Sequence, residues 1–320
     1  MRSIAVTLAA VLVSVTACAS NVTAPVQSSQ FYTLGTNAGP NPEANRSQAA
    51  NALVVKDDLY LVDAGDGAVG QLARAGLRLQ EVDGLFISHN HFDHTGGVLA
   101  VLGLRSQLNV AHTLKVYGPP GTKAFIAGLL AGMAPAEKAA FGMPRREWKS
   151  NVEVEEVVQG SIIELNGMTV LVAENTHFAI PQASGMPEKA KALSFRFNLE
   201  DRSIVYTGDT GPSEALEKLA KGADLLVSEM MDIDAILKYI QKQNPGMPER
   251  QLAGIEWHLR AHHLLPKQVG ELALKTGAKK LVVTHMAPDV TTQEMAKRYL
   301  DEIAEFYKGP AVIANDLDSF

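Results

Sequence analysis

The stretch Ser88-His89-Asn90-His91-Phe92-Asp93-His94 carries three imidazoles and one carboxylate within a few positions. It follows the apolar run Leu85-Phe86-Ile87, which predicts a buried strand, and it precedes Gly96-Gly97, which permits a sharp turn into a helix. Imidazole nitrogen and carboxylate oxygen are the ligands that zinc takes at catalytic sites. The alternative is a solvated histidine-rich loop. So many ligand-type side chains in so short a stretch favour a metal site.

The spacing of these side chains predicts two ions. His89 and His91 are two residues apart and can converge on one ion, whereas Asp93 and His94 belong to the next turn and point toward a second. Two neighbouring ions make a two-metal hydrolytic centre. The only cysteine, Cys18, lies near the N-terminus, so nitrogen and oxygen must supply the ligands. We expect two Zn²⁺ per chain, with manganese or iron as the alternative metals.

Other ligand-type residues follow or end apolar runs elsewhere in the chain, namely Asp63, His177, Asp209 and His285. Each is a weak signal alone. Asp209 can instead cap a helix starting near Pro212, and Asp63 can lie in a turn before a helix capped at Asp66. In series, ligands at successive strand ends of an α/β chain predict an αββα sandwich with the site along one edge.

The pattern His-x-His-x-Asp-His is similar to the signature of the metallo-β-lactamase superfamily, and its context resembles the ribonuclease Z and arylsulfatase branch. The segments Gly35–Pro42 and Gly118–Thr122 resemble that branch as well. The resemblance implies a four-layer αββα sandwich of the α/β class. It also implies two similar halves, at about residues 31–173 and 174–320, each β-rich and followed by helices.

The resemblance also implies a role for each ligand-type residue. The first ion would be held by His89, His91 and His177, the second by Asp93, His94 and His285, with Asp209 bridging the two. Asp63 would support the metal loop from outside the coordination sphere. A hydroxide between the ions would be the nucleophile, because zinc lowers the pKa of bound water to about 7. Asp93 would orient that hydroxide as well as bind.

A carboxylate and an imidazole in the second half point to the branch. In ribonuclease Z-like enzymes a Glu such as Glu229 orients a His such as His263, which protonates the leaving oxygen. Leu265 stands where the branch commonly has Thr, and His262 is an alternative to His263 in the role. The structural alternative is that His263 caps the helix beginning near Pro266 and that Glu229 lies on the surface.

We therefore expect an exported binuclear-zinc hydrolase of sulfate or phosphate esters, arylsulfatase-like or phosphodiesterase-like. A carbonyl-ester, thioester or lactone hydrolase of the same fold is the alternative, followed by a non-catalytic metal-binding lipoprotein. The expected partner is a small-molecule ester. We expect no nucleic acid, because the net charge is −6 and Arg145-Arg146 is a short basic spot.

The N-terminal residues have the pattern of an export signal. Arg2 precedes the apolar run Ile4–Val15, which is too short to span a membrane, so residues 1–19 read as a leader. Cleavage after Ala19 competes with lipidation of Cys18 in a lipobox-like sequence, which we favour. Residues 20–30 would be a tether and residues 31–320 the hydrolase domain. The expected location is the periplasm, with a lipid anchor. Within the domain, residues 131–150 predict a surface helical hairpin or a flap near the site.

The substitution Cys18→Ser tests the anchor. If Cys18 is lipidated, the variant should change from membrane-associated to soluble, because the acyl chains supply the membrane affinity. Fractionation and mass spectrometry of the mature N-terminus measure this. A soluble wild-type protein beginning at Ser20 would show ordinary cleavage instead.

Overall fold

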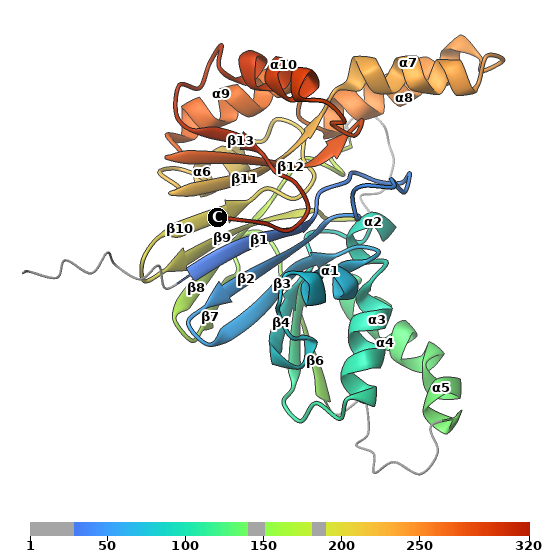
Figure 1. Ribbon diagram of the computed structural model, residues 1–320, viewed down its shortest axis with the longest axis vertical. Helices are drawn as coiled ribbons and strands as arrows, with labels where there is room; N and C mark the ends of the chain where they lie inside the picture. Colours follow the sequence, from blue (N-terminus) through green and yellow to red (C-terminus); the bar gives the residue numbers. More distant parts are fainter. Residues whose placement is uncertain (1–28, 140–150, 181–189) are drawn as a thin grey trace, which may run out of the picture.

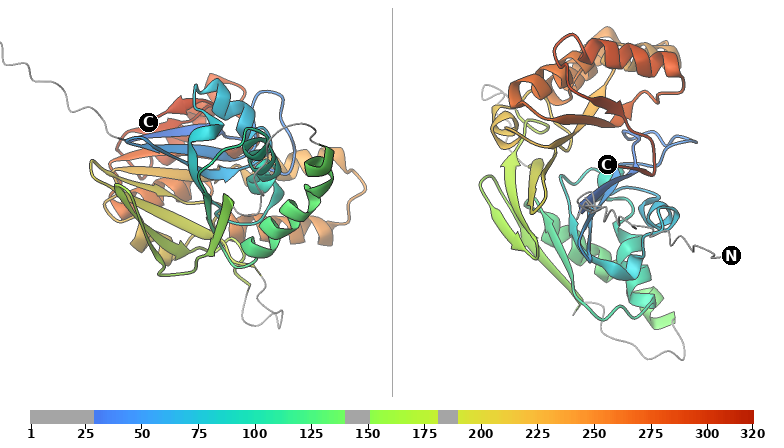
Figure 2. Two further views of the ribbon diagram at one scale, coloured as in Figure 1. Left: turned by 90° about the horizontal axis from the view of Figure 1, so that it is seen from below. Right: turned by 60° about the vertical axis from the view of Figure 1, so that its left-hand side comes forward.

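Two seven-stranded sheets pack face to face, with helices on the outer side of each (Figures 1 and 2). The computed structural model describes residues 29–139, 151–180 and 190–320. This arrangement confirms the predicted four-layer αββα sandwich. The predicted leader with Cys18, nearly all of the tether, and residues 140–150 with Arg145-Arg146 lie outside the described residues.

The first sheet is antiparallel from β1 to β3 and parallel from β3 to β6. Its strand order is β14-β1-β2-β3-β4-β5-β6, so the last strand of the chain pairs with the first. The strands are β1 (Ser29–Gly35), β2 (Ala50–Val55), β3 (Asp58–Ala64), β4 (Val82–Phe86), β5 (Leu114–Gly118), β6 (Val152–Glu156) and β14 (Asp318–Ser319).

The second sheet repeats this plan. Its order is β13-β12-β11-β10-β9-β8-β7, antiparallel from β7 to β10 and parallel from β10 to β13. The strands are β7 (Ile162–Leu165), β8 (Met168–Glu174), β9 (Leu193–Leu199), β10 (Ser203–Tyr206), β11 (Leu225–Met231), β12 (Lys280–Ala287) and β13 (Ala311–Ile313).

The boundary between the halves differs from the prediction. We expected the halves to divide near residue 173. Instead β6, which ends at Glu156, pairs in parallel with β5, and the second sheet begins with β7 at Ile162. The turn around Gly160 connects the two sheets. Since β14 returns to the first sheet, the second half also contributes a strand to the first.

Helices cover both outer faces. On the first sheet lie α1 (Ala68–Arg74), α3 (Val98–Gln107) and α4 (Thr122–Gly132), with the shorter η1 (Leu79–Glu81), α2 (Phe92–Thr95) and α5 (Ala134–Ala139) beside them. On the second lie α6 (Glu214–Leu219), α9 (Pro266–Thr276) and α10 (Gln293–Ile303). A hairpin of α7 (Ile233–Gln243) and α8 (Glu249–His262) projects at the upper right of Figure 1.

The local sequence explains the ends of α9, which begins at Pro266 as predicted. Pro266 occupies the first helical position, where its missing N–H removes no intrahelical hydrogen bond. Gly277 ends the helix in the left-handed conformation, at φ 66°, which glycine adopts without a steric penalty. We did not predict the helix α8 from the sequence.

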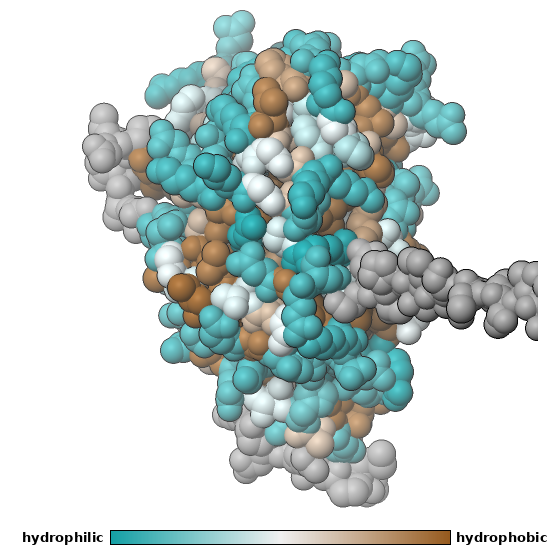
Figure 3. Space-filling model, turned by 90° about the vertical axis from the view of Figure 1, so that its left-hand side faces the viewer, coloured by the Kyte–Doolittle hydropathy of each residue, from teal (hydrophilic) through white to brown (hydrophobic). Residues whose placement is uncertain are grey.

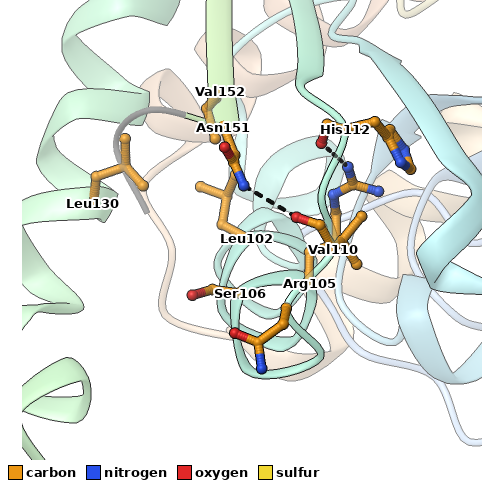
Figure 4. Close-up of a pocket in the computed structure, with 9 residues that line it drawn as sticks. Leu102, Arg105, Ser106, Val110, His112, Leu130, Asn151 and Val152 are labelled. Carbon is orange, nitrogen blue, oxygen red and sulfur yellow. Dashed lines mark hydrogen bonds between the residues drawn. The ribbon is translucent and has the colours of Figure 1, made fainter. Parts of the chain in front are cut away.

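A buried arginine fixes the helical layer over the first sheet. Arg105 lines a small cavity between α3, α4 and β6, drawn in Figure 4. Its guanidinium donates to the carbonyl oxygens of Val82 at 2.6 Å and His112 at 3.2 Å. Asn151 donates to the Val110 carbonyl at 3.0 Å from the other side of the cavity. These bonds satisfy buried backbone acceptors, so the cavity has a structural role.

Every helix within residues 29–139, 151–180 and 190–320 is too short or too polar to cross a bilayer. Figure 3 shows the left-hand side of the molecule as drawn in Figure 1, where polar side chains are interspersed with apolar ones.

Phe86 lies at the centre of the core between the sheets. Its ring stacks on Tyr117 with centroids 5.0 Å apart and meets Phe195 and Phe197 of the second sheet edge-on, at 5.5 and 5.2 Å. All four side chains are buried. The rings therefore join the inner faces of the two sheets directly.

The substitution Phe86→Ala should lower the free energy of unfolding by about 3–5 kcal/mol, because it removes a buried ring and leaves a cavity. Chemical denaturation of the metal-loaded protein measures this. Phe92→Ala is the control, since the Phe92 side chain is 83% exposed and its loss should change stability by about 0.5 kcal/mol or less. Equal losses in the two variants would contradict the assignment of Phe86 to the core.

Candidate metal centre

The strands that carry the predicted ligands all point the same way. β3 and β4 run parallel in the first sheet, and β10, β11 and β12 run parallel in the second. β8 has the same direction as β10, because two antiparallel pairings separate them. The ligand residues follow or end these strands, and they meet at one edge of the sandwich, near α2 in Figure 1.

The first group consists of His89, His91, His177 and Asp209. His91 Nδ1 lies 3.1 Å from His89 Nε2 and 3.2 Å from His177 Nε2. Asp209 Oδ2 is 3.8 Å from His89 Nε2 and 3.9 Å from His177 Nε2. In a tetrahedral zinc site with bonds of about 2.0–2.1 Å, neighbouring ligand atoms lie about 3.3–3.4 Å apart. These four atoms are spaced close to that value.

The second group consists of Asp93, His94, His285 and again Asp209. His285 Nε2 lies 3.1 Å from His94 Nε2 and 3.3 Å from Asp93 Oδ2. Asp209 Oδ1 is 3.2 Å from His94 Nε2 and 3.3 Å from His285 Nε2. One oxygen of Asp209 therefore faces each group, which is the arrangement of a bridging carboxylate. The structure brings together all seven residues predicted as ligands.

The chemistry of these donors fits two divalent cations. Asp209 Oδ1 is buried without a hydrogen-bond partner. Burial lowers the pKa of His177 to about 3 and that of His89 well below its ordinary value, so both rings are neutral. Although burial opposes ionisation of Asp209, the neighbouring His285 and His94 hold its pKa well below the ordinary range. The neutral imidazoles of His89 and His177 and the ionised carboxylate of Asp209, converging at this spacing, are donors that metal ions require.

Hydrogen bonds behind two of the histidines, His94 and His177, leave one nitrogen of each of these rings facing the site. His94 Nδ1 lies 2.7 Å from Asp63 Oδ2, and His177 Nδ1 lies 3.1 Å from the carbonyl oxygen of His262. In both rings Nε2 remains as the atom within the metal group. Partners of this kind orient metal-binding imidazoles and fix their tautomers.

Asp63 is a fully buried centre of hydrogen bonding. It accepts from the Ser88 amide and hydroxyl, both at 2.7 Å, and from the Tyr206 hydroxyl at 2.8 Å. Its φ of 58° is unusual for a non-glycine residue, and the surrounding bonds hold it there. Asp66 does not cap α1, whose N-cap is Gly67 without a side-chain bond. We did not predict Tyr206, which comes from the opposite sheet, as a partner of Asp63.

A second missed contact comes from the loop after β1. The Gly39 amide donates to Asp93 Oδ2 at 2.9 Å. A Cβ at this position would lie 2.4 Å from the Asp93 side chain, so only glycine allows the approach. Arg46 fixes the loop through its ion pair with Asp289 at 2.5 Å. The sequence offered only the glycine itself as a signal.

His263 and Glu229 form a buried pair beside the metal groups. His263 Nδ1 lies 2.9 and 3.2 Å from the two Glu229 oxygens, and the His263 ring centroid is 4.9 Å from that of His177. Burial lowers the pKa of His263, whereas burial and Asp209 raise the pKa of Glu229. Glu229 lies within β11.

The alternatives for this pair do not match the geometry. Leu265 is the N-cap of α9, so His263 does not cap that helix. Glu229 is buried and also accepts from the Thr210 amide at 2.5 Å. His262 faces away, with Nε2 2.9 Å from the Ala179 carbonyl oxygen. Asp209 does not cap α6 either, because Ser213 does so.

Comparison with known families matches residues 59–286 to the β-lactamase superfamily domain. Two curated relatives are ribonuclease Z of Brevibacillus brevis and of Mycobacterium avium, each 28% identical. The first match covers 85% of this chain and 87% of the relative, and the second covers 89% and 95%.

Solved structures support the fold. A metallo-β-lactamase fold protein of Bacillus subtilis superposes with a TM-score of 0.64 at 18% identity, over 91% of this chain and 98% of the other. The short form of human tRNase Z gives a TM-score of 0.63 at 20% identity, with the same coverage of each chain.

These relatives overturn one expectation. We predicted that nucleic acid is not a partner, yet the curated relatives are ribonucleases that match most of the chain. The prediction was wrong because it rested on net charge. The net charge describes the average over the surface, whereas an enzyme contacts RNA phosphates through a local site. A negative net charge does not exclude such a site.

The substitution Asp209→Ala should remove the oxygen atoms shared by the two groups, so we expect the metal content to fall well below two ions per chain and activity to fall with it. Chelation of the wild-type protein should abolish activity, and added zinc should restore it. Elemental analysis of gel-filtered protein measures the content. Full activity in a metal-free preparation would contradict a metal centre here.

Tyr206→Phe should weaken metal binding about 10- to 100-fold, because Asp63 loses a partner and holds His94 less firmly. Competition with a chromophoric chelator measures the affinity. Tyr60→Phe is the matched control, since Tyr60 is also buried between the sheets and its hydroxyl donates to Asp58, at 3.5 Å, and not to Asp63. Equal metal affinities in Tyr206→Phe and Tyr60→Phe would contradict a role of the Tyr206 hydroxyl in metal binding.

Proposed function

The chain belongs to the metallo-β-lactamase superfamily, and from that premise we propose that it is a phosphodiesterase of the ribonuclease Z-like type. It is a metal-dependent hydrolase that acts on ester bonds. The observation that carries the finer proposal is the buried pair of His263 and Glu229 next to the metal groups, with 2.9 Å between His263 Nδ1 and Glu229 Oε2.

The metal residues would supply the electrophilic half of the reaction. His89, His91 and His177 would hold one zinc ion, Asp93, His94 and His285 the other, with Asp209 between them. When bound, the ions contribute Lewis-acid chemistry that activates water and neutralises the charge developing on the phosphate. The role of Gly39 and Asp63 is to keep Asp93 and His94 in place through their hydrogen bonds.

His263 would supply the proton for the leaving oxygen. With Nδ1 bound to Glu229, the ring has Nε2 available for substrate. When the pair of His263 and Glu229 carries two protons, one of them is on Nε2. The other is shared between Nδ1 and the Glu229 carboxylate and can rest on either. Transfer of the Nε2 proton to the departing oxygen completes cleavage of the phosphorus–oxygen bond. Glu229 thus orients the ring and keeps the pair protonated.

This machinery suits alkyl phosphodiesters such as those of RNA. The sugar oxygen is a basic leaving group and departs slowly unless protonated, so an acid near the metals accelerates its release. The ribonuclease relatives favour phosphate over sulfate esters among the substrates expected above. We also propose export, supported by the apolar run Ile4–Val15 after Arg2. An exported enzyme would meet RNA fragments and nucleotide diesters.

His263→Ala should leave the metal content intact and slow hydrolysis of dinucleotides about 10²–10⁴-fold. Bis-p-nitrophenyl phosphate should be affected much less, because p-nitrophenolate departs without a proton. Steady-state kinetics on both substrates measure the difference. His262→Ala is the control, since His262 faces away from Glu229.

An equal loss on both phosphodiesters would contradict the acid role. The same selective loss in His262→Ala alone would assign the role to the neighbouring residue. p-Nitrophenyl sulfate completes the panel. If the wild-type protein hydrolysed the sulfate and neither phosphodiester, the proposed function would be wrong.

A further inference from the structure

Trp257 lies on α8 with 52% of its side chain exposed, close to the metal centre. Its ring centroid is 5.5 Å from that of His262, and the two ring planes are nearly perpendicular at 84°. The His262 ring is in turn 6.4 Å from that of His177, a member of the first metal group. A short series of ring contacts therefore joins this exposed indole to the site.

The helix that carries Trp257 ends next to the proposed acid. His263, the proposed acid, directly follows α8, so the oxygen that it protonates and the group attached to that oxygen lie near the end of this helix. His258, the neighbour of Trp257, has its Nδ1 2.9 Å from Nδ1 of His262.

The helix that carries Trp257 is joined to α7 by an ion pair and by apolar packing. Arg260 on α8 pairs with Asp234 on α7 and with Glu256 at 2.8 Å. Leu259 packs with Ile233 and other apolar residues at the base of the hairpin. Arg260 is thus occupied by carboxylates, while the indole ring remains available to solvent. An aromatic side chain on a rigid helix loses little conformational entropy when it binds a ligand.

We propose that Trp257 is a specificity-determining residue that stacks on a nucleobase carried by the leaving group of the substrate. The inference rests on the proposed phosphodiesterase function and deepens it, because it assigns a residue that contacts the base of the departing nucleoside. Indole rings stack on any base, because every base has a flat π face. Stacking next to His263 positions the leaving oxygen for protonation without requiring a basic surface.

Two diesters that release the same product test the inference. Deoxyadenylyl-(3′→5′)-thymidine and the methyl ester of thymidine 5′-phosphate both yield thymidine 5′-phosphate, but only the first has a base on the leaving group. Trp257→Ala should lower the ratio of kcat/KM, dinucleotide over methyl ester, roughly 5- to 100-fold. Trp257→Phe should keep most of the ratio. Tyr239→Ala is the matched control, since Tyr239 is also 52% exposed but lies on α7.

A binding measurement provides a readout that does not depend on turnover. The chain has two tryptophans, so Trp148→Phe leaves Trp257 as the only indole. The phosphorothioate analogue of the dinucleotide should quench the fluorescence of this zinc-loaded variant, and that of the methyl ester should not.

An unchanged ratio in Trp257→Ala, an equal ratio loss in Tyr239→Ala, or no quenching by the dinucleotide analogue would overturn the stacking role. Failure of the proposed function has a different signature. In that case the wild-type protein hydrolyses neither diester, while quenching still reports whether the base stacks on Trp257.

Discussion

The site depends on a single buried carboxylate that is not one of the proposed ligands. Asp63 accepts hydrogen bonds from the Ser88 amide, the Ser88 hydroxyl, the Tyr206 hydroxyl and the His94 ring, all within 2.8 Å. A buried carboxylate without such partners would cost several kcal/mol, so the loop after β4 can only pack where it supplies them. The same bonds that satisfy Asp63 therefore hold the histidine loop against the sheet.

The bridging position of Asp209 has a related consequence for stability. Each metal group takes residues from both halves of the fold: His89 and His91 meet His177, and Asp93 and His94 meet His285. Because the donors converge from two sheets, binding of the ions would join the halves as well as form the site. Metal affinity and folding stability are then linked, since the unfolded chain does not hold these donors together.

The sequence allowed the ligand set to be predicted because ligand-type residues lie at or shortly after apolar runs, and because the pattern His-x-His-x-Asp-His resembles a known metal motif. Both signals are local. His89 follows β4, and His285 lies near the end of β12. It did not reveal Tyr206, which meets Asp63 across 143 positions of the chain, or the pairing of β6 with β5. These depend on how the sheets stack. The acidic net charge led to the wrong prediction about nucleic acid, because the net charge of the whole chain does not describe the local charge at the edge of the sandwich where the metal groups lie.

The pairing of the first and last strands places the ends of the described chain at one pole of the molecule and the metal groups at the other. β1 pairs with β14, and the Phe31 amide donates to the Phe320 carbonyl at 3.0 Å, so the described chain begins and ends side by side. From Ser29 to Gly35, β1 runs roughly 20 Å toward the loop that carries Gly39. Whatever is joined to either end, a surface, a resin or a fused domain, is attached at the pole away from the ions. Neighbouring ends also make this fold a suitable scaffold for circular permutation, because a short linker can join them without crossing the entrance to the metal centre.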